Sequence, residues 1–109
     1  MIEILKNKAG LFIFQLKDKE GKIILRSDGY TQKINCQKGI SSMKRNSKNP
    51  ERIELMETKP SGWRINMKAG NGQTTAQSEI YKAEAEAKDA VKIIMNIVPT
   101  ADIRDLTKN

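Results

Sequence analysis

The sequence contains no histidine and only one cysteine among its 109 residues. Histidine is the side chain that most often serves as a general base or a metal ligand near neutral pH, so its absence removes the usual catalytic pairs and many metal sites. The Asp and Glu residues are scattered singly over the chain and form no evident metal-binding set or acid–base pair. We therefore predict a protein that is not an enzyme, with no catalytic residues, no metal and no cofactor.

Long hydrophobic runs are also missing. No segment approaches the roughly 18 consecutive apolar residues that a membrane-spanning helix needs, and the first residues lack the charged and apolar regions of a signal peptide. These absences predict a cytoplasmic protein with no membrane partner. The lone thiol, Cys36, cannot form an intrachain disulfide. It falls in a helical stripe with Ile40 and Met43, so we expect it to be buried and unreactive.

Acidic residues are absent between Gly29 and Pro50. Residues 1–50 carry 11 Lys and Arg against four Asp and Glu, whereas residues 51–109 carry nine of each, so the net charge of +7 lies entirely in the first part. The candidate residues for binding an anion or a partner are Lys33, Lys38, Lys44, Arg45 and Lys48. Such a patch is typical of nucleic-acid or polyanion binding. The scarcity of arginine and aromatic residues favours the other interpretation, a solvated lysine-rich face.

What the sequence does contain is an internal duplication. Residues 1–47 align without a gap on residues 52–98, and seven of the 47 positions are identical. The alignment keeps a turn glycine, a Ser-x-x-Tyr motif and the apolar positions in phase; the repeated motif residues are Gly21, Ser27, Tyr30, Gly72, Ser78 and Tyr81. Because a unit of about fifty residues buries little core alone, we predict one domain over 1–109 made of two tandem repeats, 1–51 and 52–109.

Each copy begins with alternating apolar and polar residues, which predicts short half-buried strands at its start and again around Phe12 and Trp63. A hairpin turn follows, over 18–21 in the first copy and over 69–72 in the second, where glycine accepts a positive φ. Return strands are expected over 22–27 and 73–78. The Ser-acid-x-Tyr motif then leads into a helix. We interpret its serine and tyrosine as structural, because no base is present to activate either hydroxyl.

Apolar residues at helical spacing predict one helix after each motif. Gly39 lies beside the first stripe and permits a close approach to a sheet. The second stripe is longer and contains Ala83, Ala87, Ala90, Val91, Ile94 and Val98. One stripe per helix places both helices on one face of a sheet. The predicted fold class is therefore α+β: two β-β-β-α repeats share one antiparallel sheet, with two helices on one face and a strand-like C-terminal tail.

The chain also contains an ordered series of short motifs. They are Phe14-x-Leu16-Lys17, Gly21-x-Ile23-Ile24, Ser27-Asp28-Gly29-Tyr30 with Lys33, residues 39–46, Met67-Lys68-Ala69 with Asn71-Gly72, Ser78-Glu79-x-Tyr81, and Arg104-Asp105-Leu106-Thr107. This ordered set resembles the YegP-like family, small bacterial proteins built from a domain of unknown function that often occurs as a tandem pair. The resemblance implies a shared antiparallel sheet with C-terminal strands exchanged between the halves, and a tandem chain that is complete as a monomer. It implies no established activity.

Functions of different classes remain open. The first is a small non-catalytic binding or interaction module that uses the free sheet face or an edge strand to meet a protein partner. The alternative is nonspecific nucleic-acid binding through the basic first repeat, with an affinity that falls as salt rises. Pairing of strand edges would instead give a homodimer, so both a monomer and a homodimer are considered. The spacing of Gln37, Ser41, Lys44 and Lys48 predicts that they lie on the exposed side of the first helix.

Overall fold

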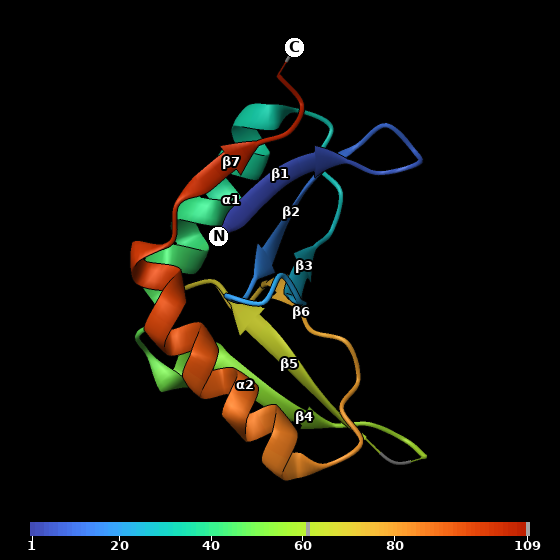
Figure 1. Cartoon of the computed structure of the whole chain (residues 1–109), viewed down its shortest axis with the longest axis vertical. Helices are drawn as coiled ribbons and strands as arrows, with labels where there is room; N and C mark the ends of the chain where they lie inside the picture. Colours follow the sequence, from blue (N-terminus) through green and yellow to red (C-terminus); the bar gives the residue numbers. More distant parts are fainter. Residues whose placement is uncertain (61, 109) are drawn as a thin grey trace.

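The computed structural model describes residues 1–60 and 62–108. Three strands and a helix follow one another twice, each helix is followed by a short 3-10 turn, and a final strand ends the series (Figure 1). In chain order the elements are β1 (Ile2–Lys6), β2 (Phe12–Lys17), β3 (Ile23–Ser27), α1 (Lys33–Asn46), η1 (Pro50–Arg52), β4 (Ile53–Glu57), β5 (Trp63–Lys68), β6 (Thr74–Gln77), α2 (Glu84–Ile97), η2 (Val98–Thr100) and β7 (Ile103–Asp105).

The seven strands of the described residues form one sheet in the order β4-β5-β6-β3-β2-β1-β7. Neighbouring strands are antiparallel except at one end, where β7 runs parallel to β1 with Ile103 opposite Ile2. The prediction of a purely antiparallel sheet is therefore wrong, and the sheet is mixed. The reason is the connection: the chain leaves α2 through η2 and reaches the sheet beside the start of β1, where the Ile2 amide donates to the Asp102 carbonyl. From that point β7 runs in the same direction as β1.

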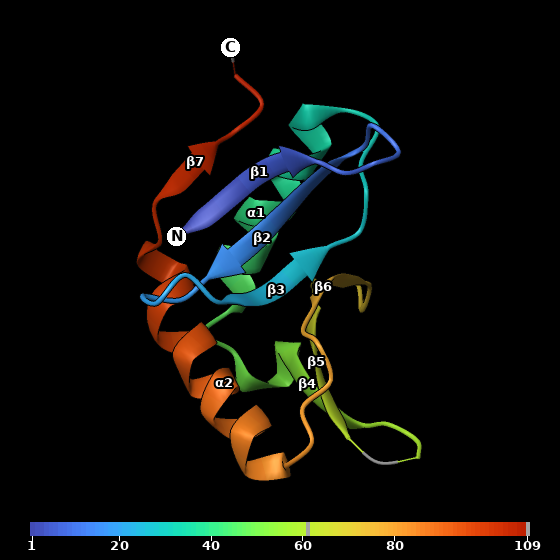
Figure 2. The ribbon, with the colours of Figure 1, turned by 45° about the vertical axis from the view of Figure 1, so that its right-hand side comes forward.

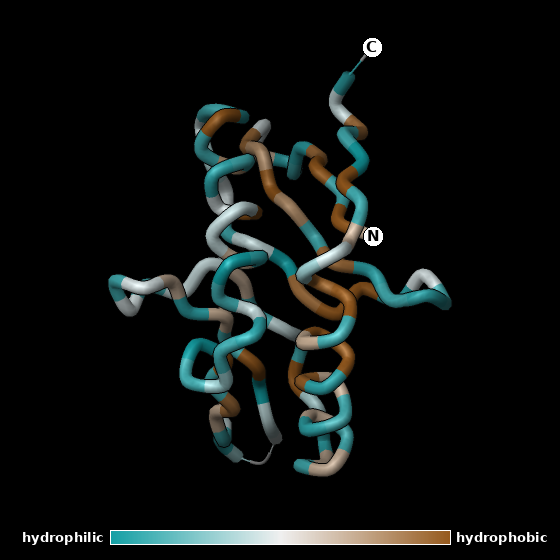
Figure 3. Tube along the Cα trace, turned by 90° about the vertical axis from the view of Figure 1, so that its left-hand side faces the viewer, coloured by the Kyte–Doolittle hydropathy of each residue, from teal (hydrophilic) through white to brown (hydrophobic). Residues whose placement is uncertain are grey.

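Both helices lie on one face of the sheet, and the opposite face is uncovered (Figures 1 and 2). The core lies between these layers and combines the stripe Cys36, Ile40 and Met43 of α1 with Ala87, Ala90 and Ile94 of α2 and with Val98. The strands contribute Ile2, Ile4, Phe14, Leu16, Leu25, Ile53, Ile65 and Met67. The predicted stripes are thus confirmed except at Ala83, which is exposed before α2 begins. The hairpin loops that project from the body are mainly hydrophilic (Figure 3).

The two predicted hairpin turns are confirmed. Gly21 and Gly72 adopt φ angles of 84° and 86°, a left-handed conformation that favours glycine. The Asp18 carboxylate accepts hydrogen bonds from two amides of the first turn, and the Asn71 side-chain oxygen accepts one in the second. The return strands are shorter than expected, because β3 begins at Ile23 and β6 extends only from Thr74 to Gln77.

The two serines of the repeated motif make the same pair of contacts. The Ser27 hydroxyl accepts from the Phe14 amide at 2.9 Å and donates to the Asp28 carbonyl at 2.9 Å. The Ser78 hydroxyl accepts from the Ile65 amide at 2.9 Å and donates to the Glu79 carbonyl at 2.7 Å. Each buried hydroxyl therefore takes the place of a backbone acceptor where the chain leaves the sheet for a helix.

The tyrosines of the motif pair with the second strand of each repeat, and Tyr30 also sets how closely α1 approaches the sheet. Tyr30 exchanges backbone hydrogen bonds with Phe12, and Tyr81 does so with Trp63, at 2.7 to 2.8 Å. A β-carbon at Gly39 would lie 2.5 Å from the Tyr30 hydroxyl oxygen and 3.1 Å from the Phe14 ring. The close approach expected at Gly39 is therefore confirmed: α1 packs directly on the tyrosine ring.

The serine contacts lead to a stability prediction. Ser27→Ala and Ser78→Ala should each lower the free energy of unfolding by about 1–3 kcal/mol, because each leaves a buried amide without its acceptor. Ser41→Ala is the matched control: Ser41 is exposed on α1, and its loss should change stability by less than about 0.5 kcal/mol. Urea unfolding of the three variants measures this, and equal stability of all three would contradict the role given to the two hydroxyls.

Candidate binding surface on the uncovered sheet face

Two of the five cations that the sequence singled out make contacts within the protein. The Lys33 ammonium lies 2.8 Å from the Asp105 carboxylate, and the Lys44 ammonium donates to the Ala101 carbonyl at 2.7 Å. Both partners belong to the C-terminal segment, which we define as residues 101–108. These two lysines therefore hold the C-terminal segment against α1.

The other three cations, Lys38, Arg45 and Lys48, are exposed. None of them forms an ion pair with another residue in the described part of the chain. The side of α1 that carries Gln37 and Ser41 borders a pocket shared with the C-terminal segment. Gln37, Ser41 and Lys48 are exposed as expected, whereas Lys44 is half-buried where it contacts the C-terminal segment.

The C-terminal segment is held by the charge of one carboxylate. A hydrogen bond from Lys33 and others from Thr107 hold the pKa of the Asp105 carboxyl well below its usual value of 3.8. The Thr107 amide donates to this carboxylate at 2.8 Å, and the Leu106 amide donates to the Ile4 carbonyl at the same distance. The end of β7 is thus fixed to both α1 and β1.

A row of polar side chains crosses the uncovered face of the sheet. We call it the polar ladder, and its members are Glu3, Gln15, Arg26, Gln77, Asn66 and Glu54. In the half nearer β1, the Gln15 amide donates to the Glu3 carboxylate at 2.9 Å and the Arg26 guanidinium donates to the Gln15 oxygen at 3.1 Å. Lys17 adds an ion pair to Glu3 at 3.0 Å. The hydrogen bond from Gln15, followed by that from Lys17, lowers the pKa of Glu3.

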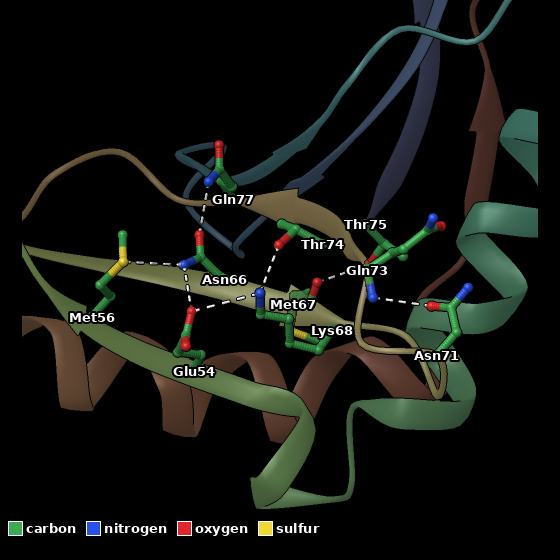
Figure 4. Close-up of polar contacts among 10 residues, drawn as sticks. All are labelled: Glu54, Met56, Asn66, Met67, Lys68, Asn71, Gln73, Thr74, Thr75 and Gln77. Carbon is green, nitrogen blue, oxygen red and sulfur yellow. Dashed lines mark hydrogen bonds and ion pairs between the residues drawn. The ribbon is translucent and has the colours of Figure 1, made fainter.

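The other half of the polar ladder repeats this arrangement (Figure 4). Gln77 donates to the Asn66 oxygen at 2.9 Å, and Asn66 donates to the Glu54 carboxylate at 2.8 Å. Lys68 lies 3.7 Å from the same carboxylate. The halves meet where Arg26 lies opposite Gln77 in the pairing of β3 with β6. The polar ladder therefore reaches from β1 to β4 without leaving the uncovered face.

The uncovered face carries an excess of positive charge. Its two carboxylates, Glu3 and Glu54, are already paired with Lys17 and Lys68. Three further cations lie on the same face: Arg26, Arg64 and Arg104, which occupy sheet positions opposite Gln77, Met56 and Glu3. These guanidinium groups are the charges that remain available to an anionic partner.

The Cys36 thiol and the two tyrosines of the repeated motif have raised pKa values. Burial, followed by the nearby Asp105 charge, raises the pKa of the Cys36 thiol to about 11, so it is protonated near neutral pH. Burial likewise raises the pKa values of Tyr30 and Tyr81. No three His, Cys, Asp or Glu side chains gather to hold a metal ion among residues 1–60 and 62–108. None of the described helices has both the length and the apolar character to cross a membrane.

The sequence interpretation missed the polar ladder. A signal for each half was present, because Glu3 and Gln15, like Glu54 and Asn66, occupy the polar phase of alternating strands. Hairpin register brings each of these pairs together. The join between Arg26 and Gln77 had no such local signal, because β3 and β6 are far apart in the chain.

Comparison with known proteins places the chain in a family. Residues 7–54 and residues 59–105 each match the family described as "Domain of unknown function (DUF1508)". The chain is similar to a "UPF0339 protein in ptx operon 5'region" of Stutzerimonas stutzeri, with 36% identity over 93% of this chain and 91% of the relative. It is also similar to the UPF0339 protein YegP of Yersinia pestis, with 34% identity over 96% of this chain and 94% of the relative.

Two solution NMR structures have the same fold. A UPF0339 protein from Shewanella oneidensis gives a TM-score of 0.91 at 32% identity, covering 96% of this chain and 89% of that one. The protein of unknown function yegP from E. coli also gives 0.91, at 28% identity, covering 99% of this chain and 94% of that one. The resemblance to YegP-like proteins and the α+β class are therefore confirmed.

The Asp105 contacts predict a pH response at the C-terminal segment. Because the folded pKa of Asp105 is lowered, its stabilising effect is fully present above the usual carboxyl value and is lost as pH falls through the lower folded value. Lys33→Met should raise the midpoint of the Asp105 titration toward 3.8. The measurement is the Thr107 amide shift in an NMR pH titration.

A control separates this effect from a general change of charge. Lys22 pairs with Glu79 at 3.8 Å between exposed side chains, so Lys22→Met should leave the Asp105 midpoint unchanged. Equal midpoints in the unmodified protein and in Lys33→Met would show that the Lys33 contact does not hold the carboxylate.

Proposed function

Because the chain belongs to the DUF1508 family, whose function is unknown, we propose its function from the geometry of its surfaces: a non-catalytic binding module that recognises an anionic partner through the uncovered sheet face. The observation that carries this proposal is the polar ladder. Its side chains are fixed by one another on the one sheet face that no helix covers. A surface already ordered in this way loses less conformational entropy when a partner binds.

The protonation states support a non-catalytic role. The Glu3 carboxylate has a lowered pKa, and a weakly basic group of this kind is a poor general base near neutral pH. The Cys36 thiol, with a pKa of about 11, is a poor nucleophile under the same conditions. Glu3, Gln15 and Asn66 are buried among their neighbours and hold the polar ladder in place. Its exposed members, such as Arg26 and Gln77, can meet a ligand by hydrogen bonding.

The charges of the uncovered face favour an anion. The Glu3 and Glu54 charges are balanced by neighbouring lysines, so Arg26, Arg64 and Arg104 leave a positive excess. Guanidinium groups bind phosphate and carboxylate oxygens through two parallel hydrogen bonds. Gln77 of β6 lies between Arg64 of β5 and Arg26 of β3 in the sheet order, and its exposed side-chain amide can donate or accept further hydrogen bonds.

We also infer that the binding module is a tandem repeat of residues 1–51 and 52–109 forming one domain. The two separate matches to the DUF1508 family support this inference, as do the equivalent contacts of Ser27 and Ser78. A chain that contains both units completes the shared sheet alone, so we expect a monomer. Cytoplasmic location is part of the same proposal, and the single cysteine fits a reducing compartment.

Nucleic-acid binding through α1 is the second candidate. It is favoured by one observation: Lys38 and Arg45 are exposed on α1, Lys48 is exposed in the turn that follows it, and none of the three forms an ion pair among the described residues. Three charges on or next to one helix suit contact with a phosphate backbone. This candidate uses a different surface, so variants distinguish it from the first.

The test is a titration of labelled single- and double-stranded DNA and RNA, and of polyglutamate, at about 50 and 200 mM salt. A triple Arg→Gln variant at positions 26, 64 and 104 removes three charges from the uncovered face. A triple variant to Ser at 38, 45 and 48 removes three charges from α1 and the turn that follows it. The charge-matched control is a triple Lys→Ser variant at 8, 19 and 59, which lie in exposed loops.

We expect the Arg→Gln variant to bind most weakly and to lower the slope of log K against log salt by about 2–3. The control should lose only the general charge effect. Equal losses in all three variants, or no binding to any polyanion at the lower salt, would overturn the proposed role of the uncovered face. Selective loss in the α1 variant would instead establish the second candidate.

A further inference from the structure

The two outer edges of the sheet differ in whether another strand pairs with them. At one end β7 covers the outer edge of β1: the Ile2 amide donates to the Asp102 carbonyl, and the Leu106 amide donates to the Ile4 carbonyl, both at 2.8 Å. At the other end β4 pairs with β5, and no strand of the described residues pairs with its outer edge. The molecule therefore has one occupied and one open strand edge.

The open edge and the occupied edge belong to equivalent strands, because the repeat alignment, with its shift of 51 residues, places β4 on β1. Ile53 and Leu55 of β4 correspond to Ile2 and Ile4 of β1, and both pairs lie on the core side of their strands. Ile4 is 1% exposed beneath β7, whereas Leu55 is only half-buried. An apolar position that β7 helps to cover in one half is thus left partly open in the other.

The backbone of the open edge is available from Leu55 onward. The Ile53 amide already donates to the Pro50 carbonyl at the end of η1. In an antiparallel pair, alternate residues direct their backbone groups away from the partner strand. On β1 the outward residues are Ile2 and Ile4, which contact β7. The equivalent residues of β4 are Ile53 and Leu55, and the alternation continues to Glu57. Because the Ile53 amide is occupied, Leu55 and Glu57 are the outward residues that remain available.

The charges beside the open edge are inverted relative to the occupied one. Lys6 and Lys33 lie over the Phe12 ring at 5.0 and 5.8 Å, and Lys33 binds the Asp105 carboxylate that β7 brings. In the second repeat, Trp63 occupies the position equivalent to Phe12. Glu57 and Glu84 occupy the positions equivalent to Lys6 and Lys33. Glu57 lies directly opposite Trp63 in the pairing of β4 with β5.

These differences define what the open edge can accept. A strand placed on β4 as β7 lies on β1 would bring its equivalent of Asp105 close to Glu84, so that position must be a cation. The cation would also face Trp63, the aromatic ring that interacts best with positive charge. Glu84 is paired with Lys88 at 3.6 Å, but both side chains are exposed, and surface pairs of this kind are weak and exchangeable.

We propose that the outer edge of β4 is a strand-accepting site for an extended basic peptide segment of a partner protein, with an apolar residue beside Ile53 and a Lys or Arg beside Leu55, close to Trp63, Glu57 and Glu84. The segment adds to the sheet as an eighth strand, parallel to β4, as β7 is parallel to β1. Main-chain hydrogen bonds supply affinity, and the charged position supplies selectivity. This inference rests on the repeat relationship proposed above, and it is independent of anion binding by the uncovered face.

The test uses two synthetic peptides and isotope-labelled protein. One peptide has the sequence of residues 101–108 of this chain, and the other has the same sequence with Asp105→Lys. We expect the substituted peptide to shift the NMR amide signals of residues 53–57 and the indole signal of Trp63, and to bind at least about tenfold more tightly than the unsubstituted peptide, since one charge pair replaces a repulsion.

A protein variant and a peptide variant provide the controls. Glu84 lies on the exposed first turn of α2. The variant Glu84→Lys should reverse the preference between the two peptides. Methylation of the peptide backbone nitrogen at the Leu106 position removes the donor that bonds Ile4 in the native β7, so it should abolish the shifts in β4. An unchanged preference in Glu84→Lys, or shifts confined to β1 or to the arginines of the uncovered face, would overturn the proposal.

The outcomes separate this inference from the proposed function. Peptide shifts in β4 without polyanion binding would retain the strand-accepting site and reject the anionic partner. Polyanion binding without any shift in β4 at millimolar peptide would do the reverse.

Discussion

The structure depends on a contact of only two residue pairs. Arg26 lies opposite Gln77 and Ser27 lies opposite Ala76, and this short pairing of β3 with β6 joins the two groups of strands into one sheet. So short a contact supplies few hydrogen bonds, and it persists because the helices span it. Helix α1 packs against β2 on one side of the join and against β5 and β6 on the other. The core that holds the join is therefore shared by both halves of the chain.

The continuous polar ladder is a consequence of that join. Strand pairing aligns side chains of neighbouring strands on the same face, so placing Arg26 opposite Gln77 brings two hairpin-based clusters into one row. Strand pairing also extends the row at the β1 end of the sheet, where Arg104 of the C-terminal segment lies opposite Glu3. The surface that we propose as functional is thus assembled from the whole chain, although each of its parts is a local hairpin.

Much of the fold could be predicted from the sequence because its signals are local. The turn glycines, the alternation around Phe14 and the stripe through Cys36 each act within one hairpin or one helix, and the structure contains all three. The parallel direction of β7 had no local signal, because it depends on where α2 and η2 deliver the chain. The same limit applies to Lys33 and Lys44: their partners, Asp105 and Ala101, are 72 and 57 residues away. A cation count therefore described these lysines as surface charge when they hold the C-terminal segment.

The charge on the outer edge of β4 bears on which strands can pair with it. An open strand edge invites pairing with another copy of the same strand, and charged side chains on that edge oppose it. Glu57 places a carboxylate on β4 that forms no ion pair among the described residues, so a second β4 approaching the edge would bring like charges close together. The same carboxylate attracts a basic strand. One side chain can thus disfavour self-association and favour a partner of opposite charge, whereas the β1 edge is already closed by β7 and the pairing of Asp105 with Lys33.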